Sequence, residues 1–495
     1  MVKATLAAIL CATCLLPASA VGHEAQAARG ATTRHQASPQ PRPVKSPPNV
    51  VVILADDLGW PDVSAYGRSE VPTPNIDRIA KSGAAFTNGY VTASVCAVSR
   101  AGLLTGKMPQ RFGFTYNISD RGNADKGAGL PVGEKTLGDR LKARGYRTGA
   151  FGKWHQGQDE QFYPTRRGFD EFFGFLSGET VYVDPKTPGF VTTPTKADKY
   201  PLDTRDAAGA VVEGPNRAPV RNFDRYLTDE ITDHAVDFID RSAKGGDRFF
   251  AYVAYNAPHW PLQAPQQWYD RFPHIKDPVR RTYVAMIAAM DAGIGEILDE
   301  LDRTGQRDNT LVVFLSDNGC PQQFGFCDCS HPLGAGKFTY LEGGARVPFV
   351  VSWPNGMKPA VVDTPVSSLD ITTTVLAAVD RGRPLPKDLD GSDLVAIANG
   401  HGDRNRTLLW SQAPVSAARW GKWKLRTSDD AKTAWLYDLS RDPAETHDVA
   451  AQNPKVAARL QSNLSAWRSK LPEPLWPLHA TRQAMICNRP TEWVY

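Results

Sequence analysis

The sequence predicts an α/β fold, with a large, mostly parallel or mixed sheet sandwiched by helices and a smaller C-terminal α+β part. Continuous apolar, β-branched runs are typical of strands buried on both faces, and they occur at 50–55, 249–255 and 310–315. Segments with apolar residues at helical spacing lie between and beside them, at 135–144, 227–241 and 281–301. The alternation is typical of a sheet covered by helices on both faces. At 495 residues and 41% hydrophobic content, the chain can form a sizeable core and a second, smaller unit.

The first 48 residues predict an export signal and a linker. Lys3, the apolar run 4–16 and the small residues 18–20 match the three parts of a secretory signal peptide, so we expect residues 1–20 to be removed. Residues 21–48, rich in Ala, Gln, Arg and Pro, are predicted to be a flexible linker. We therefore expect an exported protein, periplasmic or secreted. No later apolar run is long enough to span a membrane, so we expect no membrane partner. The net charge of +4 is dispersed along the chain, so we expect no nucleic-acid partner.

The cysteines predict one free thiol. Five of them follow residue 20, and an odd number leaves one unpaired in an oxidising compartment. Cys96 is the natural unpaired residue, because the other four, including Cys487, could form two bridges. Cys327 and Cys329 are too close in sequence to pair with each other, so we expect Cys320 to pair with one of them.

Oxygen-bearing side chains follow two of the predicted strands. Asp56 and Asp57 end the first strand, and Asp317 and Asn318 end the strand at 310–315. Open α/β sheets bind their ligands at the carboxyl ends of the strands, where Asp residues also occur simply as turn formers or helix caps. Because the arrangement recurs, we favour a metal site. A set made only of oxygens suits Ca²⁺ or Mg²⁺ rather than zinc.

A thiol and several basic groups are predicted to join this site. Cys96 lies one helical turn before Arg100 at an expected helix N-terminus, a place that suits an anion, although a buried structural Cys is the alternative. Further basic residues stand at expected strand ends and in the Gly-flanked loop 334–344; they are Lys153, His155, His259 and Lys337. Each alone could be a solvated surface residue, but together beside a cation they indicate a pocket for an oxyanion ester.

With these residues, the chain resembles a type I sulfatase of the alkaline phosphatase superfamily from about Asn49 to its C-terminus. The blocks that carry the resemblance, in order along the chain, are ADDLG (55–59), PTPNID (72–77), CAVSRAGLLTG (96–106), GKWH (152–155), APH (257–259), SDNG (316–319) and GAGKFTYLEGG (334–344). One block would be weak evidence, whereas seven in this order are strong. The resemblance implies the alkaline phosphatase-like fold and a sulfatase activity.

The resemblance also implies the cofactors. A formylglycine-generating maturation enzyme would oxidise Cys96 to formylglycine, whose hydrate is the nucleophile. Asp56, Asp57, Asp317 and Asn318 would bind Ca²⁺, with Mg²⁺ the less favoured ion, and the attacking hydroxyl at position 96 would be a further metal ligand.

The remaining site residues receive roles from the same resemblance. Arg100 would steady the hydrate, while Lys153, His259 and Lys337 would hold the sulfate and assist the leaving oxygen. His155 would take the proton from the second hydroxyl, which releases sulfate and restores the aldehyde. Hydrolysis is thereby divided into two easier steps, as covalent catalysis requires.

Val98 is the one departure from the family pattern. The maturation motif is Cys-x-Pro-Ser-Arg, sometimes with Ala at the third place, and this chain has Val98 there. The sequence leaves two alternatives beside a sulfatase, of which only the second follows from Val98. One is a phosphodiester or phosphonate hydrolase on the same scaffold, and the other is an unmatured, non-catalytic relative.

The domain and substrate predictions complete the sequence analysis. We expect a catalytic domain over 49–395 and a C-terminal subdomain over 396–495. The subdomain should contain strand-like runs and one helix, at 408–410, 418–425, 435–439 and 454–471. A sulfated carbohydrate or small molecule is the expected substrate, and the candidates for contacting its remainder are Arg111, Trp260 and His331. The sequence predicts no particular oligomeric state.

Overall fold

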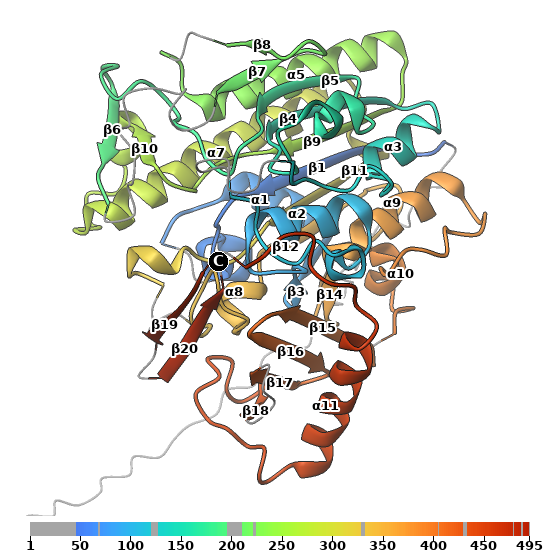
Figure 1. Cartoon of the computed structure of the whole chain (residues 1–495). Coiled ribbons are helices and arrows are strands. Elements are labelled where there is room, and N and C mark those ends of the chain that lie inside the picture. The colour runs from blue at the N-terminus through green and yellow to red at the C-terminus, as the bar shows by residue number, and fades with distance from the viewer. Residues whose placement is uncertain are drawn as a thin grey trace, which may run out of the picture. The chain divides into compact units, whose positions relative to one another are not determined.

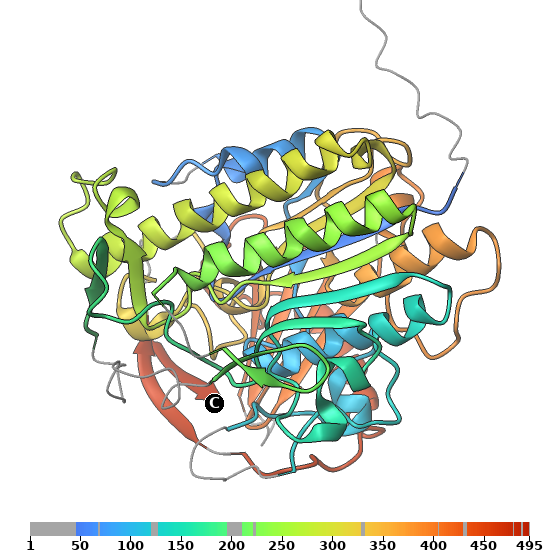
Figure 2. The same ribbon diagram turned by 90° about the horizontal axis from the view of Figure 1, so that it is seen from above.

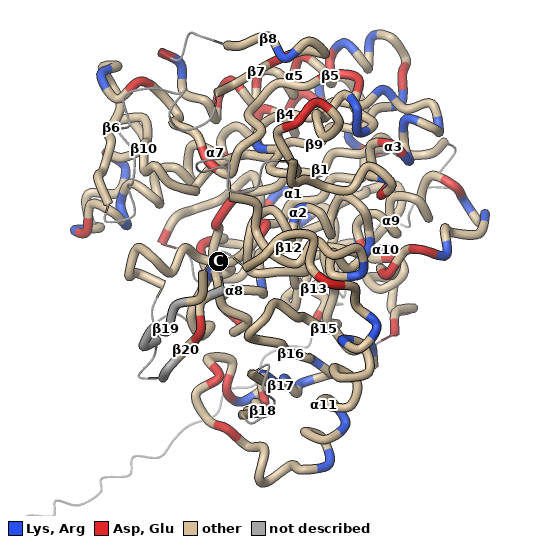
Figure 3. The backbone as a smooth tube through the Cα atoms, viewed as in Figure 1, with Lys and Arg blue, Asp and Glu red and all other residues tan. Residues whose placement is uncertain are grey.

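The computed structural model describes residues 46–494, apart from 68–69, 120–126, 196–209, 221–223, 328–331, 404, 429–432, 479 and 487–488. The predicted signal peptide and most of the predicted linker therefore lie outside the described residues, as do Cys329, His331 and Cys487. No helix in the described part of the chain is long and apolar enough to cross a membrane. Basic and acidic residues are interspersed along it (Figure 3).

A ten-stranded mixed sheet forms the centre of the molecule (Figure 1). In spatial order its strands are β13 (Ala360–Val362), β2 (Ala84–Phe86), β12 (Phe349–Ser352), β11 (Thr310–Ser316), β1 (Asn49–Ala55), β9 (Phe249–Ala254), β4 (Arg147–Lys153), β5 (Glu171–Phe175), β7 (Val211–Glu213) and β8 (Ala218–Pro219). The five strands from β11 to β5 are parallel to one another. β1 is entirely buried and pairs with β11 from Asn49–Thr310 to Ala55–Ser316. The carboxyl ends of these two strands therefore lie side by side.

Helices cover both faces of this sheet, which confirms the predicted fold class (Figure 2). On one face lie α1 (Pro74–Lys81), α5 (Leu227–Gly245) and α7 (Pro278–Arg303). On the other face lie α2 (Cys96–Thr105), α3 (Leu137–Lys142) and α9 (Leu369–Asp380). Alternate residues of β1 serve the two cores, Val51 and Ile53 on the first face and Val50 and Val52 on the second.

The C-terminal part forms a second, four-stranded antiparallel sheet. Its strands are β15 (Thr407–Gln412), β16 (Val415–Trp420), β17 (Trp423–Ser428) and β18 (Ala434–Asp438), and α11 (Pro454–Arg468) packs on it. The expected single run 418–425 is wrong, because it is a hairpin. Gly421 adopts φ 58°, a left-handed conformation that glycine takes without strain, and the chain turns there so that Trp420 pairs with Trp423. The predicted division into domains at residue 395 stays a prediction.

Further short elements lie outside the two large sheets. They are the pairs β3 (Gly89–Tyr90) with β14 (Val366–Ser367), β6 (Phe190–Thr193) with β10 (Leu262–Pro265), and β19 (Thr481–Ile486) with β20 (Arg489–Val494), and the helices α6 (Gln266–Tyr269), α8 (Glu342–Ala345) and α10 (Leu394–Ala398). Of these, α8 matters most for function, because it ends the Gly-flanked loop 334–344.

Candidate active site

Oxygen ligands converge where β1 and β11 end. Asp56 and Asp57 follow β1, while Asp317 and Asn318 follow β11, and all four are at most 1% exposed. The backbone N–H of Asp57 donates to Asp317 Oδ1 at 3.3 Å, and the Asn318 amide donates to Asp57 Oδ1 at 2.6 Å. Asp57 has a positive φ of 67°, a strained conformation for a non-glycine residue that often marks functional sites. The parallel pairing predicted from sequence thus brings three carboxylates to one edge of the sheet.

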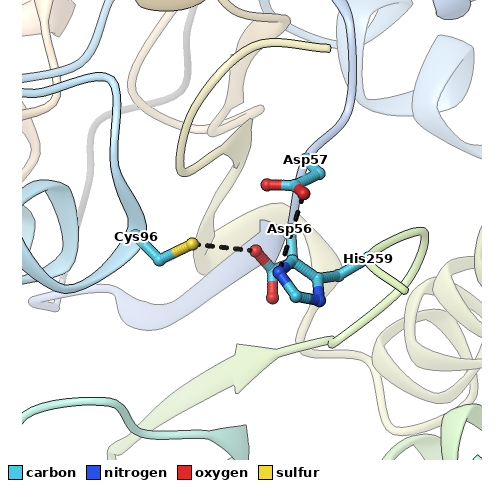
Figure 4. Close-up of side chains that lie close together, drawn as sticks. All are labelled: Asp56, Asp57, Cys96 and His259. Carbon is cyan, nitrogen blue, oxygen red and sulfur yellow. Dashed lines mark hydrogen bonds and ion pairs between the residues drawn. The ribbon is translucent and has the colours of Figure 1, made fainter. Parts of the chain in front are cut away.

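Cys96 begins α2 and faces these carboxylates (Figure 4). Its thiol lies 3.5 Å from Asp56 Oδ1 and 3.4 Å from Asn318 Oδ1 and can donate to either, and the Lys337 ammonium donates to Sγ at 3.1 Å. Burial raises the pKa of this thiol to about 12. An unmodified Cys96 is therefore held as a neutral thiol, the weakly nucleophilic form.

Three cations balance the three carboxylates. Arg100 donates to Asp317 Oδ2 at 2.8 Å and lies 3.7 Å from Asp56 Oδ2. The Lys153 ammonium is 2.6 Å from Asp56 Oδ2, and the Lys337 ammonium is 2.7 Å from Asp57 Oδ1. Burial alone would lower the pKa of each cation, but the adjacent carboxylates hold all three pKa values above their usual range. The site consequently keeps three full positive charges in a place with little water.

Two histidines complete the site. Burial lowers the pKa of both, and the neighbouring Lys153 and Arg100 lower that of His155 further. His155 Nε2 lies 3.2 Å from the carbonyl oxygen of Ile118, so Nε2 carries the hydrogen and Nδ1, which is buried without a hydrogen-bond partner, is left as an acceptor. His259 Nε2 lies 3.7 Å from Asp57 Oδ2.

The donor set fits a divalent cation. One ligand atom from each of Asp56, Asp57, Cys96 and His259 lies within 4.8 Å of the others, and Figure 4 shows Cys96 facing Asp56, with Asp57 above His259. Asp57 Oδ2 is buried without a hydrogen-bond partner, which leaves one carboxylate oxygen free to coordinate. Carboxylate and amide oxygens are the ligands that hard cations prefer. His259 enters this group although it was not expected as a ligand.

The three residues expected to contact the rest of the substrate do not all lie at the site. Trp260 is 8% exposed, and its ring stacks on that of His259 with centroids 5.8 Å apart. Arg111 instead forms an ion pair with Asp390 at 2.6 Å and donates to the Asp388 carbonyl. His331 lies outside the described residues. A substrate role for these residues stays a prediction.

Supporting contacts that the sequence did not reveal hold the site in place. Asn117 accepts the Ala97 N–H at 3.0 Å, and Gln156 donates to the Ala97 carbonyl at 2.8 Å, so two loops brace the start of α2. Neither residue belongs to a recognisable motif. The predicted pairing of Cys320 is confirmed, with Cys327 as its partner, and the Cys320 carbonyl accepts the Lys337 N–H at 2.8 Å.

The fold and the site define a hydrolase for anionic esters built on an α/β sheet, with a nucleophile position between carboxylate metal donors and ammonium groups. Comparison with known proteins gives the particular family. The Sulfatase family profile matches residues 48–380. Human arylsulfatase A is 32% identical over 472 residues, covering 84% of this chain and 87% of the relative. Human N-acetylgalactosamine-6-sulfatase is 34% identical over 361 residues, covering 70% and 65%.

A solved structure agrees with these relatives. The crystal structure of Ps i-CgsB in complex with k-i-k-neocarrahexaose has a TM-score of 0.77 and 33% identity, covering 87% of this chain and 95% of that one. The chain belongs to the sulfatase family and is a sulfuric ester hydrolase of the type I class.

Proposed function

We propose that this sulfatase is exported, matures Cys96 to formylglycine, binds Ca²⁺ and hydrolyses sulfate esters of carbohydrates. The position of Cys96 Sγ carries the proposal, since it lies within 3.5 Å of Asp56, Asn318 and Lys337 at once. A hydroxyl at this position would be close both to oxygen ligands of a cation and to an ammonium group. The signal-peptide pattern over residues 1–20 supports export.

The two cofactors would supply what the chain lacks. Asp56, Asp57, Asp317 and Asn318 would hold the cation, which as a Lewis acid would withdraw charge from a sulfate oxygen. The hydrated aldehyde at position 96 would provide a nucleophilic hydroxyl, which the buried thiol with a pKa of about 12 does not. A formylglycine-generating enzyme is therefore the proposed maturation partner.

The chain's own cations would bind the sulfate and orient the nucleophile. Arg100 is fixed by Asp317 and by the Lys153 carbonyl, so its guanidinium can hold position 96 in one orientation. Lys153 and Lys337 present fully charged ammonium groups to Asp56 and Asp57 respectively. Both would offset the negative charge of the bound ester as its S–O bond lengthens.

Two proton transfers would complete the hydrolysis. The hydroxyl at position 96 would bond to sulfur and give up its proton while the ester S–O bond breaks, and Lys337 or His259 would supply a proton or a hydrogen bond to the departing oxygen. His155 Nδ1, the partnerless acceptor, would take the proton from the second hydroxyl at position 96, so that sulfate leaves. Water then restores the hydrate, and the overall change is one ester and one water converted to an alcohol and sulfate.

The relatives support a carbohydrate substrate. One is named for N-acetylgalactosamine 6-sulfate chemistry, and another was crystallised with k-i-k-neocarrahexaose, although human arylsulfatase A carries an aryl name. The stacked pair of His259 and Trp260 beside the site is suited to lie against a sugar ring.

The deciding experiment compares purified, calcium-loaded protein on three substrate types: sulfated oligosaccharides, an aryl sulfate, and the matching aryl phosphate and phosphonate esters. We expect kcat/KM to be highest on a sulfated oligosaccharide. Preference for the phosphorus esters would contradict the proposal in favour of a phosphohydrolase. An unmodified thiol at position 96 in protein from the native source, with no ester turned over, would identify a non-catalytic relative.

A further inference from the structure

A second buried cluster of charges joins the Lys337 loop to the four-stranded sheet. Glu342, the first residue of α8, is fully buried, and so are Lys424 of β17 and Glu445. The Lys424 ammonium lies 2.9 Å from Glu342 Oε1 and 3.1 Å from Glu445 Oε1. Glu445 also accepts the backbone N–H of Glu342. A single ammonium thus connects two carboxylates that are far apart in the sequence.

The other oxygen of Glu342 is occupied as well. The Tyr90 hydroxyl donates to Glu342 Oε2 at 2.6 Å, and the guanidinium groups of Arg346 and Arg419 lie 3.5 Å and 3.8 Å from it. Figure 1 shows α8 at the border between the large sheet and β15–β18. Glu342 is therefore held from both sides of that border.

The cluster is one of several attachments between this loop and the C-terminal part, which include the Phe338 ring stacked on that of Trp493. At the start of the loop, a Cβ built on Gly334 would come within 2.4 Å of the Ala444 carbonyl, so the two backbones are in close contact. In the middle, the Tyr340 hydroxyl bonds to Gln412 at 2.9 Å. At the end, Glu342 binds Lys424. The loop that carries Lys337 is held at both of its ends.

The same loop contacts the reactive centre directly. The Phe338 N–H donates to the Ser94 carbonyl at 2.9 Å, two residues before Cys96. The Ser94 hydroxyl and the Gly319 N–H both donate to the Gly344 carbonyl at 3.0 Å. A shift of the loop would therefore move Lys337 relative to Cys96 and to Asn318.

We infer that Lys424 and Glu445 are positioning residues, which set the place of Lys337 by holding Glu342 at the start of α8. Buried ion pairs add little stability compared with apolar packing of the same volume, and a documented use is to select one arrangement among several. Here the ion pairs would select one arrangement of the loop 334–344, which carries Lys337. The inference rests on the proposed function of Lys337, and it assigns to the four-stranded sheet a part in the geometry of the site.

The test is a double-mutant cycle on a sulfate ester, with four proteins: wild type, Lys424→Met, Lys337→Ala and the double variant. Lys424→Met should lower kcat/KM about 10²-fold, because a displacement of about 1 Å is enough for such a loss. If Lys424 acts through Lys337, the double variant should be no worse than Lys337→Ala alone. Losses that multiply would overturn the inference, since a role in stability alone acts equally in both backgrounds.

Two further variants keep the test interpretable. Lys422→Met removes an exposed lysine two residues away that pairs with Asp438, and it should leave kcat/KM unchanged. Lys424→Arg keeps the charge and should retain most of the activity. If Lys424→Met does not fold, Glu445→Gln replaces it in the same cycle, because it keeps the size of the side chain and the carbonyl that accepts the Glu342 N–H.

Hydrogen exchange provides a measurement that does not depend on activity. Amides of 334–344 should exchange faster in Lys424→Met than in wild type, while those of α5 should be unchanged. Unchanged exchange in 334–344 would overturn the inference. If the wild type hydrolyses no sulfate ester, the proposed function fails by itself, and the exchange measurement still decides whether Lys424 holds the loop.

Discussion

The molecule contains two buried clusters of unlike charges, and only one of them has the features of an active site. Asp56, Asp57 and Asp317 with their three cations occupy the end of the large sheet. Glu342 and Glu445 with Lys424 occupy the border to the four-stranded sheet. Both are almost inaccessible to water, so burial and charge do not separate them.

What separates them is where the groups point. In the first cluster the carboxylates and ammonium groups surround Cys96. In the second, both oxygens of Glu342 are bound by the protein's own donors, Lys424 and Tyr90, and the charged groups face one another rather than a nucleophile. Atoms without a hydrogen-bond partner occur in both clusters, Asp57 Oδ2 in the first and Glu445 Oε1 in the second. A buried charge cluster therefore indicates catalysis when its groups converge on an atom that can react, and architecture when they pair with one another.

The largest expected effect comes from the first cluster. Asp317→Ala should reduce kcat/KM by more than about 10³-fold, because it removes a metal donor and the anchor of Arg100. Asp308→Ala, an exposed carboxylate at the other end of β11, is the matched control and should be neutral. Chelation should depress wild-type activity reversibly on return of calcium. Full activity in Asp317→Ala would remove this strand end from the site.

A smaller effect, specific to the substrate, is expected at Lys337 and His259 of the first cluster. Lys337→Ala and His259→Ala should lose about 10²-fold on esters with poor leaving groups and much less on activated aryl sulfates. Only the poor leaving groups need help with developing charge. The check is kcat/KM over a series of leaving-group pKa values. Equal losses across the series would restrict both residues to binding sulfate.

The second cluster should make the free energy of unfolding depend on pH. Burial raises the pKa of Glu445 to about 6, the Glu342 carboxylate adds to this, and Lys424 opposes it. Arg419 also faces Glu445. A raised carboxyl pKa means that the unfolded chain ionises first as pH rises, so stability is lost between about pH 4.5 and pH 6, by on the order of 2 kcal/mol.

In Glu445→Gln the side chain at position 445 cannot ionise, so this variant does not lose stability as pH rises through that range. The difference in unfolding free energy, wild type minus variant, should therefore decrease as pH rises through that window, as measured by urea unfolding at pH 4.5, 5.5 and 7. A difference independent of pH would mean that Glu445 is not held with a raised pKa.

The smallest effect on stability is expected at Val98. It is the third residue of α2 and fully buried, and the first bond within the helix is that of Ser99 N–H to the Val95 carbonyl. Val98→Pro loses no helix bond and should change stability by less than about 1 kcal/mol, while raising the fraction of Cys96 converted. Peptide mass spectrometry and thermal unfolding measure the two quantities.

The neighbouring substitution is the control for this prediction. Ala97→Pro removes the N–H that bonds to Asn117 and should be clearly destabilising. Equal conversion of Cys96 in Val98→Pro and wild type would show that Val98 does not limit maturation.

The first cluster could be predicted from sequence because each of its parts has a local signature. Buried strands ending in Asp56 and Asp317 place them at one sheet edge, and parallel pairing makes them neighbours, as observed. Cys96 and Arg100 lie one turn apart on the expected helix. Lys153 and Lys337 were predicted from the chemistry of their residue type and from the order of the sequence blocks along the chain.

The second cluster could not be predicted in this way. Lys424 and Glu445 lie 82 and 103 residues from Glu342, and no periodicity links them. The segment around Glu445 has the pattern of a turn, and Lys424 stood in a run that was expected to be one strand and is two. The partners of a buried charge depend on how two sheets meet, and that information lies in no single stretch of sequence.

Cys96 is synthesised well before the groups that enclose it, because they lie far along the chain. Lys337 lies 241 residues after Cys96, and Asn318 222 residues after it. A ribosome adding about 5 to 20 residues per second needs roughly 10 to 50 s to cover that interval. Until then the strand and the loop that bury the thiol do not exist. The proposed oxidation of Cys96 thus has a window that closes when the second half of the chain arrives, and slower translation of that half would prolong it.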